Sequence, residues 1–588
     1  MDGWFARSVR GVFTLACGLV AATSACESKV EDRTPEEPSD FWALPPLDPR
    51  IPMGGGSRPT TGGGFGSGVG DPPQASENYV FVPNPEGRSV VVIDSRELTI
   101  RSIETGNAPS YLRTIPGSDA ALVLNVGTGD ASVVRVAGDG TLSTTRLAVV
   151  KGANAIEIAP DGRHAVVFFD ADKGIAGNDF GDFQSVSVVS LQPGAESSAT
   201  LSVGFKPERV AYQRDSLRAF VVTEQGLSVL NFADIEAMGS GIAPALSFGS
   251  QQVVREEIAF SADGHYAVAP MPFSAELRLL DLDSGLETVR NLQALFPSEP
   301  DTFAKPYFAS LDYDSERSCL YAVEAQFRSV VRIPIPSGLT GEGVILRQTV
   351  PHDVTRVSHM PGSDLVLSYR PDSGVSKLSV IDFSRVRSVP SAGAGGAGGA
   401  GGMAGEGGDS GDGAAMPGLQ THELRKGVQA VYPSPDGTTA IISHDRQFGD
   451  PNEEGIPLEL RILRSSGHTL LHPENGELKL ERTAADIDDV VFSGDGKFAF
   501  LLINEPSLRY PVAGQFSVRE VHRIDLARFL TNPIILLDSA PIAGAAVPGQ
   551  TRVFVSQDHP DGRLTFIDWL TSDVQTVTGF ELNSRIRN

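Results

Sequence analysis

The sequence has 588 residues, and 40% of them are hydrophobic, which is enough to build a substantial core. Its 63 glycines, 40 prolines and aromatic share of only 7% favour many short strands joined by turns over long helices. The formal net charge of −25 argues against a nucleic-acid-binding protein, because that function depends on Lys and Arg neutralising phosphates.

Residues 1–25 have the form of a secretory signal peptide. Arg7 and Arg10 precede an apolar run at 12–22 that is too short to span a bilayer. The run ends in TSAC at 23–26, which resembles the lipobox of bacterial lipoproteins, although Thr23 stands where that family usually has Leu. The resemblance implies that Cys26 is lipidated and becomes the mature N-terminus. Simple secretion without a lipid is the alternative.

The next stretch, 26–78, is polar and rich in Pro and Gly, with segments such as EDRTPEEPSD and GGGSRPTTGGGFGSGVGDPP. A segment of this composition cannot bury enough apolar surface to fold. We therefore expect a disordered tether between the lipidated cysteine and a folded body. Contact with the membrane is expected through the lipid anchor only.

One pattern recurs through 79–588: an apolar strand, a turn ending in Asp-Gly, and a second apolar strand. It reads NAIEIAPDGRHAVVFF at 154–169, EEIAFSADGHYAVAP at 256–270, VQAVYPSPDGTTAIIS at 428–443 and DVVFSGDGKFAFLLI at 489–503. Because a strand pair cannot bury its own apolar face, the copies must stack on one another. The pattern predicts an all-β fold, a β-propeller built from four-stranded antiparallel blades.

The number of blades follows from the spacing of the modules. We expect 7–10 modules and count about ten, which begin near residues 79, 109, 153, 207, 255, 306, 355, 428, 488 and 540. A single propeller usually has four to eight blades. Loops that mimic modules, an unusually large ring and two propellers are all open interpretations, and we favour one continuous body.

Two segments complete this prediction. The first module supplies only the last three of its four strands. We therefore expect residues 581–587 to supply the missing first strand and to close the ring. Residues 391–418, SAGAGGAGGAGGMAGEGGDSGDGAAMPG, are expected to be a disordered Gly-rich loop inside one blade, because 378–383 and 419–427 each resemble a strand of the same module. An interdomain linker is the alternative for this segment.

Apolar strands that end in Asp, such as VVVID at 90–94, LSVIDF at 378–383 and LTFIDW at 564–569, follow these turns. Together with the turns they resemble bacterial YVTN-type and WD40-like β-propellers, although the Gly-His and Trp-Asp marks of WD40 repeats are missing. The resemblance implies a surface or periplasmic protein that binds other molecules. Some related propellers are lactonases or carry quinone cofactors, so the fold alone does not choose a function.

Residues that could carry chemistry are few. Asp170, Asp172 and Asp179 lie in one acidic loop, DADKGIAGNDFGD, and oxygen ligands at such short spacing suit Ca²⁺. A polar turn is the competing interpretation, because the spacing and terminal Glu of an EF-hand are absent. The ten histidines show none of the spacings typical of a zinc site. Cys319 lies in an alternating strand and is expected to be a small buried residue.

Two classes of function are compatible with these features. The first is an exported, lipid-anchored propeller of the bacterial cell envelope that acts as a binding or scaffold module for an envelope protein or polysaccharide. The second is an envelope enzyme, a lactonase-like or other metal-dependent hydrolase, which needs His, Asp, Asn or Glu from different modules to converge at one mouth. We expect the first class, with no firmly implied cofactor.

Overall fold

Each predicted module forms one antiparallel sheet of four strands in the computed structural model, and one of these sheets gains a fifth, parallel strand, β16 (Gly241–Ile242), from the following module. The structure describes residues 71–173, 181–213, 215–249, 253–261, 263–296, 306–371, 376–386, 417–444, 455, 457, 465–505 and 518–580. All of them belong to one unit, Arg50–Asn588. In these residues the strands form ten sheets, which we number as blades 1 to 10 in chain order.

In blades 1 to 5 the strands follow chain order from the innermost position outwards. Blade 1 contains β1 (Gln74–Ala75), β2 (Tyr79–Asn84), β3 (Ser89–Asp94) and β4 (Ile100–Glu104); blade 2 contains β5 (Pro109–Thr114), β6 (Ala120–Asn125), β7 (Asp130–Val136) and β8 (Leu142–Ala148); blade 3 contains β9 (Ala155–Ile158), β10 (His164–Phe168), β11 (Ser185–Ser190) and β12 (Ser197–Ser202); blade 4 contains β13 (Arg209–Tyr212), β14 (Arg218–Thr223), β15 (Gly226–Asn231) and β17 (Ala245–Leu246); blade 5 contains β18 (Ala259–Phe260), β19 (Tyr266–Pro270), β20 (Glu276–Asp281) and β21 (Glu287–Asn291).

Blades 6 to 10 follow the same order. Blade 6 contains β22 (Phe308–Asp314), β23 (Cys319–Glu324), β24 (Ser329–Pro334) and β25 (Leu346–Thr349); blade 7 contains β26 (Arg356–His359), β27 (Leu365–Tyr369), β28 (Lys377–Asp382) and β29 (Leu419–Glu423); blade 8 contains β30 (Ala430–Pro433), β31 (Ala440–His444), β32 (Gly467–His472) and β33 (Glu477–Arg482); blade 9 contains β34 (Asp486–Phe492), β35 (Phe498–Glu505), β36 (Val518–Asp525) and β37 (Leu530–Leu536); blade 10 contains β38 (Pro541–Ala546), β39 (Arg552–Gln557), β40 (Arg563–Asp568) and β41 (Val574–Thr578).

Helical structure is sparse in the described residues. Two short α-helices, α1 (Phe232–Met238) and α2 (Ser337–Thr340), follow the third strands of blades 4 and 6. Three 3₁₀ turns lie at η1 (Ala171–Lys173), η2 (Arg255–Glu257) and η3 (Gln293–Leu295). Within the described part of the chain, no helix is both long enough and apolar enough to cross a membrane.

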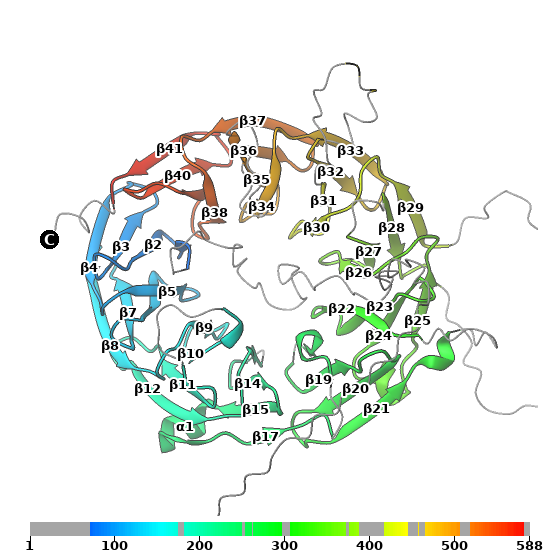
Figure 1. Cartoon of the computed structure of the whole chain (residues 1–588), viewed down its shortest axis with the longest axis horizontal. Helices are drawn as coiled ribbons and strands as arrows, with labels where there is room; N and C mark the ends of the chain where they lie inside the picture. The colour runs from blue at the N-terminus through cyan, green and yellow to red at the C-terminus, as the bar shows by residue number, and fades with distance from the viewer. Residues whose placement is uncertain are drawn as a thin grey trace, which may run out of the picture. The chain divides into compact units, whose positions relative to one another are not determined.

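The blades stand side by side in one ring, with the first strand of each blade innermost and the fourth at the rim (Figure 1). Ten clusters of buried side chains occur in the described residues, and each cluster joins two neighbouring blades. One of them contains Val80 and Val91 of blade 1 together with Phe554 and Phe566 of blade 10. The protein is therefore a single closed ten-bladed β-propeller, and the prediction of one continuous body is confirmed.

The sequence pattern of each blade follows from this packing. A second strand such as β6 is covered by neighbouring blades on both faces, so every residue from Ala120 to Asn125 is buried. A fourth strand such as β8 lies at the rim, where most of its residues are exposed or half-buried. The buried second strands consequently have nearly continuous apolar runs, and the fourth strands are the most exposed of each module.

The innermost strand of blade 1 comes from the segment just before β2. This strand is β1, which pairs with Phe81 and Val80 of β2. We expected residues 581–587 in this position, and those residues lie outside the described part of the chain. The position of β1 has a local reason: Ser76 Oγ and Asn78 N each donate to Asp119 Oδ1 of blade 2 at 2.8 Å, which fixes the segment before β2 against the ring.

Residues 71–78, which we expected in the tether, thus contact the propeller. Asp71 Oδ2 lies 2.7 Å from Arg113 Nη1 of β5, and Asp71 N donates to Ser110 O. Residues 1–25, which we expected to be a signal peptide, Cys26 and the rest of the expected tether lie outside the described residues.

The Gly-rich segment joins two adjacent strands of one blade. β28 ends at Asp382 and β29 begins at Leu419, and the two pair antiparallel in blade 7. The structure places the insertion within a blade, as we expected, and residues 391–416 themselves lie outside the described residues.

The alternation of strand direction gives the ring two different faces. The turns between first and second strands and the connections between third and fourth strands lie on one side, which we call the turn face. The loops between second and third strands and the connections from one blade to the next lie on the other side, which we call the loop face.

Candidate functional site

The turn face is built from tight, repeated turns. In the four Asp-Gly turns predicted from the sequence, the Asp carboxylate accepts the backbone N–H two residues on, at 3.0–3.2 Å. The glycines that follow, Gly162, Gly264, Gly437 and Gly496, have φ between 68° and 70°, a left-handed conformation that glycine adopts without a steric penalty. The Asp-Gly pairs therefore serve turn geometry, as expected.

These turns also pack on one another from blade to blade. A Cβ on Gly437 of blade 8 would lie 1.8 Å from Pro361 O of blade 7, and one on Gly162 of blade 3 would lie 2.7 Å from Pro116 O of blade 2. Gly549 N of blade 10 donates to Glu77 O of blade 1 at 2.9 Å. The inner part of the turn face is thus occupied by contacts between blades.

The loop face has a different construction. In six blades the second strand ends on a buried polar residue; these residues are Asn84, Asn125, Thr223, Glu324, His444 and Gln557. Each binds the loop that follows its strand, the third strand or the connection that enters its blade. The loop face is therefore held from beneath by buried hydrogen bonds.

Three of these residues illustrate the arrangement. Glu324 accepts the backbone N–H groups of Phe327 at 2.7 Å and of Gln326 at 3.1 Å, and burial raises the pKa of its carboxyl. Gln557 donates to Thr565 Oγ1 at 2.6 Å and accepts from Ser539 N at 3.3 Å. Asn84 Oδ1 accepts from Gly87 N at 2.8 Å. Such bonds to otherwise unpaired backbone groups fix the loops in position.

The predicted calcium ligands lie on this face, between β10 and β11 of blade 3. Asp170 is buried, its backbone is bound by the Asn154 amide at 2.6 and 2.8 Å, and its Oδ1 accepts from Asp172 N at 3.0 Å. Asp172 Oδ1 lies 3.2 Å from Lys206 Nζ. Asp179 lies outside the described residues.

No group of three or more His, Cys, Asp or Glu side chains in the described residues is placed to hold a metal ion. In that part of the chain Asp170 Oδ1 accepts from Asp172 N, and Asp172 Oδ1 pairs with Lys206 Nζ. The Ca²⁺ site of Asp170, Asp172 and Asp179 stays a prediction. Cys319 is buried as expected, and burial raises the pKa of its thiol, so it has the character of a packing residue.

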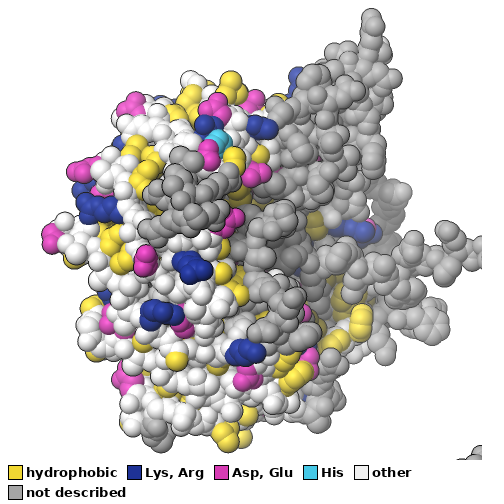
Figure 2. All heavy atoms as spheres, turned by 60° about the vertical axis from the view of Figure 1, so that its left-hand side comes forward, with side chains coloured by type: hydrophobic (Ala, Val, Ile, Leu, Met, Phe, Trp, Pro, Cys, Tyr) yellow, Lys and Arg dark blue, Asp and Glu magenta, His cyan; other side chains and the backbone are white. Residues whose placement is uncertain are grey.

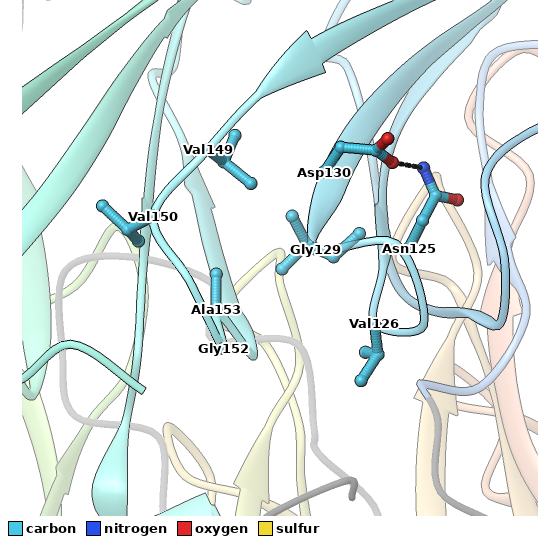
Figure 3. A pocket seen from close by; sticks show the side chains of 9 residues that line it. Asn125, Val126, Gly129, Asp130, Val149, Val150, Gly152 and Ala153 are labelled. Atoms are coloured by element: carbon cyan, nitrogen blue, oxygen red, sulfur yellow. Dashed lines mark hydrogen bonds between the residues drawn. The ribbon is translucent and has the colours of Figure 1, made fainter. Parts of the chain in front are cut away.

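A small cavity opens beside the Asn125 loop, between blades 2 and 3 (Figure 3). Its volume is about 10 Å³, at the lower limit of the space that one water molecule needs, and its walls come from the loop after β6 and the connection that leads into β9. Val126, Val149, Val150 and Ala153 make it mostly apolar, and Asn125 Nδ2 donates to Asp130 Oδ1 at 2.8 Å on one side. It is smaller than the pockets that usually hold a substrate or cofactor.

The loop face also exposes aromatic side chains. Phe205 stacks on Phe183 with ring centroids 5.8 Å apart, and Phe183 meets the edge of buried Phe169 at 5.2 Å. Phe205 and Phe273 are both exposed. On the side of the ring drawn in Figure 2, by contrast, the coloured hydrophobic side chains form small groups separated by charged ones. Exposed aromatic rings on a rigid face are typical contact residues of binding surfaces.

Sequence reasoning did not find most of these residues. A single Asn, His or Glu at the end of a strand looks like any loop residue, and its burial depends on the neighbouring blade. The turn after β19 likewise gave no signal that Phe273 would be exposed with a φ of 53°. The repeated position of a polar residue at the end of the second strand was the available signal.

Comparisons with known proteins give no family for this chain. No protein-family model matches it, and no curated protein matches it. Among solved structures it is similar to a eukaryotic initiation factor, with 10% identity, a TM-score of 0.46, and coverage of 79% of this chain and 97% of the other. It is also similar to the dihydro-heme d1 dehydrogenase NirN in complex with DHE, with 10% identity, a TM-score of 0.36, and coverage of 88% and 78%.

A third similar structure is the β-propeller domain of Cps50 (Swd1) from Myceliophteria thermophila, with 11% identity, a TM-score of 0.29, and coverage of 63% of this chain and 96% of the other. Identities this low give no basis for transferring a function. The fold of this chain is a WD40-like β-propeller, as its own four-stranded antiparallel blades establish.

Proposed function

We propose that this chain is an exported, lipid-anchored β-propeller that acts as a binding or scaffold module of the bacterial cell envelope. The observation that carries the proposal is the difference between the two faces. The turn face repeats one tight turn and uses it to join blades, whereas the loops of the loop face differ in length among the blades and are fixed in six blades by a buried polar residue. Variable loops on a rigid frame are the usual construction of a binding surface.

The partner we propose is an envelope protein or polysaccharide that contacts the loop face. The net charge of −25 supports a partner other than nucleic acid. The exposed rings of Phe205 and Phe273 supply apolar contact area on that face.

Site-specific photo-crosslinking in intact cells tests which face binds. A photoreactive amino acid replaces Asn107 or Gln326, which are exposed on the loop face, or Arg163 or Lys497, which are exposed on the turn face. We expect crosslinked species from the loop-face positions only. Equal crosslinking from both faces, or crosslinking from the turn face alone, would contradict the proposal.

The lipid anchor rests on the sequence around Cys26 and has its own test. Cells expressing the full chain are labelled with radioactive palmitate, and the Cys26→Ser variant is compared with a Cys319→Ser control. We expect label in the natural chain and in the control, and none in Cys26→Ser, which should be released from the membrane fraction. Label that persists in Cys26→Ser would overturn the anchor.

A further inference from the structure

The last five blades of the ring repeat the first five. The turn after the first strand reads IPGSD at 115–119 in blade 2 and MPGSD at 360–364 in blade 7. In both turns the serine N–H donates to the carbonyl of the first residue at 3.2 Å, and the glycine has a φ of 67° or 68°. Blades 2 and 7 thus share sequence and geometry, and they lie on opposite sides of the ring (Figure 1).

Blades 1 and 6 match in the same way. Their third strands read SVVVID at 89–94 and SVVRIP at 329–334, and in each blade the preceding loop ends on an arginine with a φ of 52° or 50°. Asn84 and Glu324, which end the second strands, accept the backbone N–H three residues further on at 2.8 and 2.7 Å. The match therefore includes the buried residues that hold the loops.

Blades 3 and 8 and blades 4 and 9 continue the repeat. Blades 3 and 8 share the turn Pro-Asp-Gly, and both turns pack on the proline carbonyl of the repeated turn in the preceding blade, Pro116 or Pro361. The second strands of blades 4 and 9 contain RAFVV at 218–222 and FAFLL at 498–502. We call blades 1 to 5 the first half of the ring and blades 6 to 10 the second half.

The repeat includes the two interfaces that join the halves. Blades 5 and 6 pack through one cluster of buried side chains, and blades 10 and 1 pack through another. Seven positions of the repeat contribute to both clusters. They are Leu320 and Val80, Ala322 and Val82, Val331 and Val91, and Ile333 and Ile93 in blades 6 and 1, and Val268 and Phe554, Leu277 and Leu564, and Leu279 and Phe566 in blades 5 and 10. Each half therefore ends in the same two apolar surfaces.

Strand pairing confirms that these positions are equivalent. Leu320 lies opposite Ile333 and Ala322 opposite Val331 in blade 6, just as Val80 lies opposite Ile93 in blade 1. The same holds in blades 5 and 10 for the three pairs given above. The end surfaces of the two halves consequently have the same arrangement of side chains, although individual residues differ in size.

The connection between the halves is the longest between any two blades. It runs from the end of β21 at Asn291 to the start of β22 at Phe308, whereas seven of the other eight connections contain at most six residues. A short connection holds two blades in contact, and a longer one allows them to separate. Two compact halves joined in this way have the construction of two units in tandem.

We propose that each half of the ring fits a second copy of itself, so that the partner for which these end surfaces are built is another copy of the same five-bladed half. The observation that carries this proposal is the use of the same buried positions at both interfaces. Blade 5 can then pack on blade 1 as it packs on blade 6, and two first halves from two chains complete one ten-bladed ring.

Closure within one chain is preferred for two reasons. The connection keeps the two halves of a chain at a high effective concentration. In addition, Phe554 and Phe566 of blade 10 fill more space than Val268 and Leu279 of blade 5, so a ring of two first halves is less fully packed than the natural ring. Binding of a second chain is therefore measured when closure within the chain is blocked.

Two variants of the full chain block closure. In the first, Val331→Asp and Phe566→Asp put a charge on both end surfaces of the second half, where these side chains are buried. In the second, Val91→Asp and Leu279→Asp do the same to the first half. The control carries all four substitutions, so that neither half has an intact end surface.

Native mass spectrometry and limited proteolysis measure the result. We expect each two-site variant to form a dimer in which the unmodified halves resist the protease: blades 1 to 5 in the first variant and blades 6 to 10 in the second. The control should remain a monomer that is digested throughout. Monomers in both two-site variants would overturn the proposal, and so would dimers in the control, because those would form through another surface.

Discussion

At the scale of single residues, the ring depends on glycines that adopt a left-handed backbone conformation and, because they have no side chain, let the neighbouring blade approach closely. Gly437 has a φ of 68° and lies directly against Pro361 O of the preceding blade. Gly362 has the same φ of 68°, but a Cβ there would meet nothing within 4 Å. In blade 4 the position equivalent to Gly437 is Ser216, with a φ of 56°. The turn itself therefore tolerates a side chain where the neighbouring blade leaves room.

Alanine substitutions at Gly362 and Gly437 separate the energetic cost of backbone strain from the cost of disturbing the contact between blades. Gly362→Ala should lower the free energy of unfolding by about 1 kcal/mol, the usual cost of a left-handed non-glycine residue. Gly437→Ala carries the same strain and in addition forces two blades apart, so we expect a loss of about 3 kcal/mol or more. Urea denaturation of both variants measures the difference. Equal losses would show that the contact between blades 7 and 8 relaxes freely.

At the scale of elements, blade 4 extends onto blade 3 through residues 232–244, which follow β15. Within this insertion β16 (Gly241–Ile242) adds a parallel fifth strand to the outer edge of β12. The ring of Phe232 stacks on His164 of blade 3 with centroids 4.3 Å apart, and Glu236 Oε1 lies 3.0 Å from His164 Nε2. The insertion thus joins blades 3 and 4 at the rim as well as in the core.

The packing of Phe232 should contribute far more than the ion pair. Phe232 is 2% exposed, so Phe232→Ala should cost about 3–5 kcal/mol. The Glu236 side chain is half exposed, so Glu236→Gln should cost less than about 1 kcal/mol. Thermal unfolding at pH 7 compares the two. A larger loss in Glu236→Gln than in Phe232→Ala would contradict this assignment.

At the scale of the whole molecule, nine interfaces are backed by continuous chain and the one between blades 10 and 1 is not. That interface is held by buried apolar side chains, by Gly549 N bonded to Glu77 O, and by Gln550 Nε2 bonded to Asn78 Oδ1 at 2.9 Å. Asn78 also donates to Asp119 of blade 2. Residues 71–78 therefore connect blades 10, 1 and 2.

Truncation tests this role directly. A chain that begins at Asp71 should melt at the same temperature as the full chain, because it keeps every described contact. A chain that begins at Tyr79 loses the hydrogen bonds onto the Asp119 carboxylate and should be less stable by about 3 kcal/mol or more. Limited proteolysis should then cut first in blades 1 and 10. Identical melting of the two chains would show that residues 71–78 do not help to close the ring.

The sequence predicts the repeat well because each blade is made from one continuous segment with its own apolar runs and turns. All ten modules begin within a few residues of an observed blade. β1 was missed because a two-residue strand in a Pro- and Gly-rich segment has no periodicity to detect, and its position depends on Asp119, 41 residues away from Asn78.

The candidate site was less predictable for the same physical reason. The acidic loop at Asp170 was predicted as a site from its local composition. The burial of Glu324 and His444, in contrast, arises from packing across strands and blades. Sequence patterns predict the strands and turns of one segment at a time, whereas this site forms where side chains from separate strands come together.

The closed ring also sets a condition on the number of blades. Every interface fixes a rotation between neighbouring sheets, and ten such rotations must add up to one complete turn. Gain or loss of a whole blade would change the rotation required at every remaining interface, and all of the clusters between blades would have to repack. The long insertion between β28 and β29 changes no rotation, because those two strands still pair in the same sheet. Length can thus vary freely in the connections of this chain, whereas the blade count cannot.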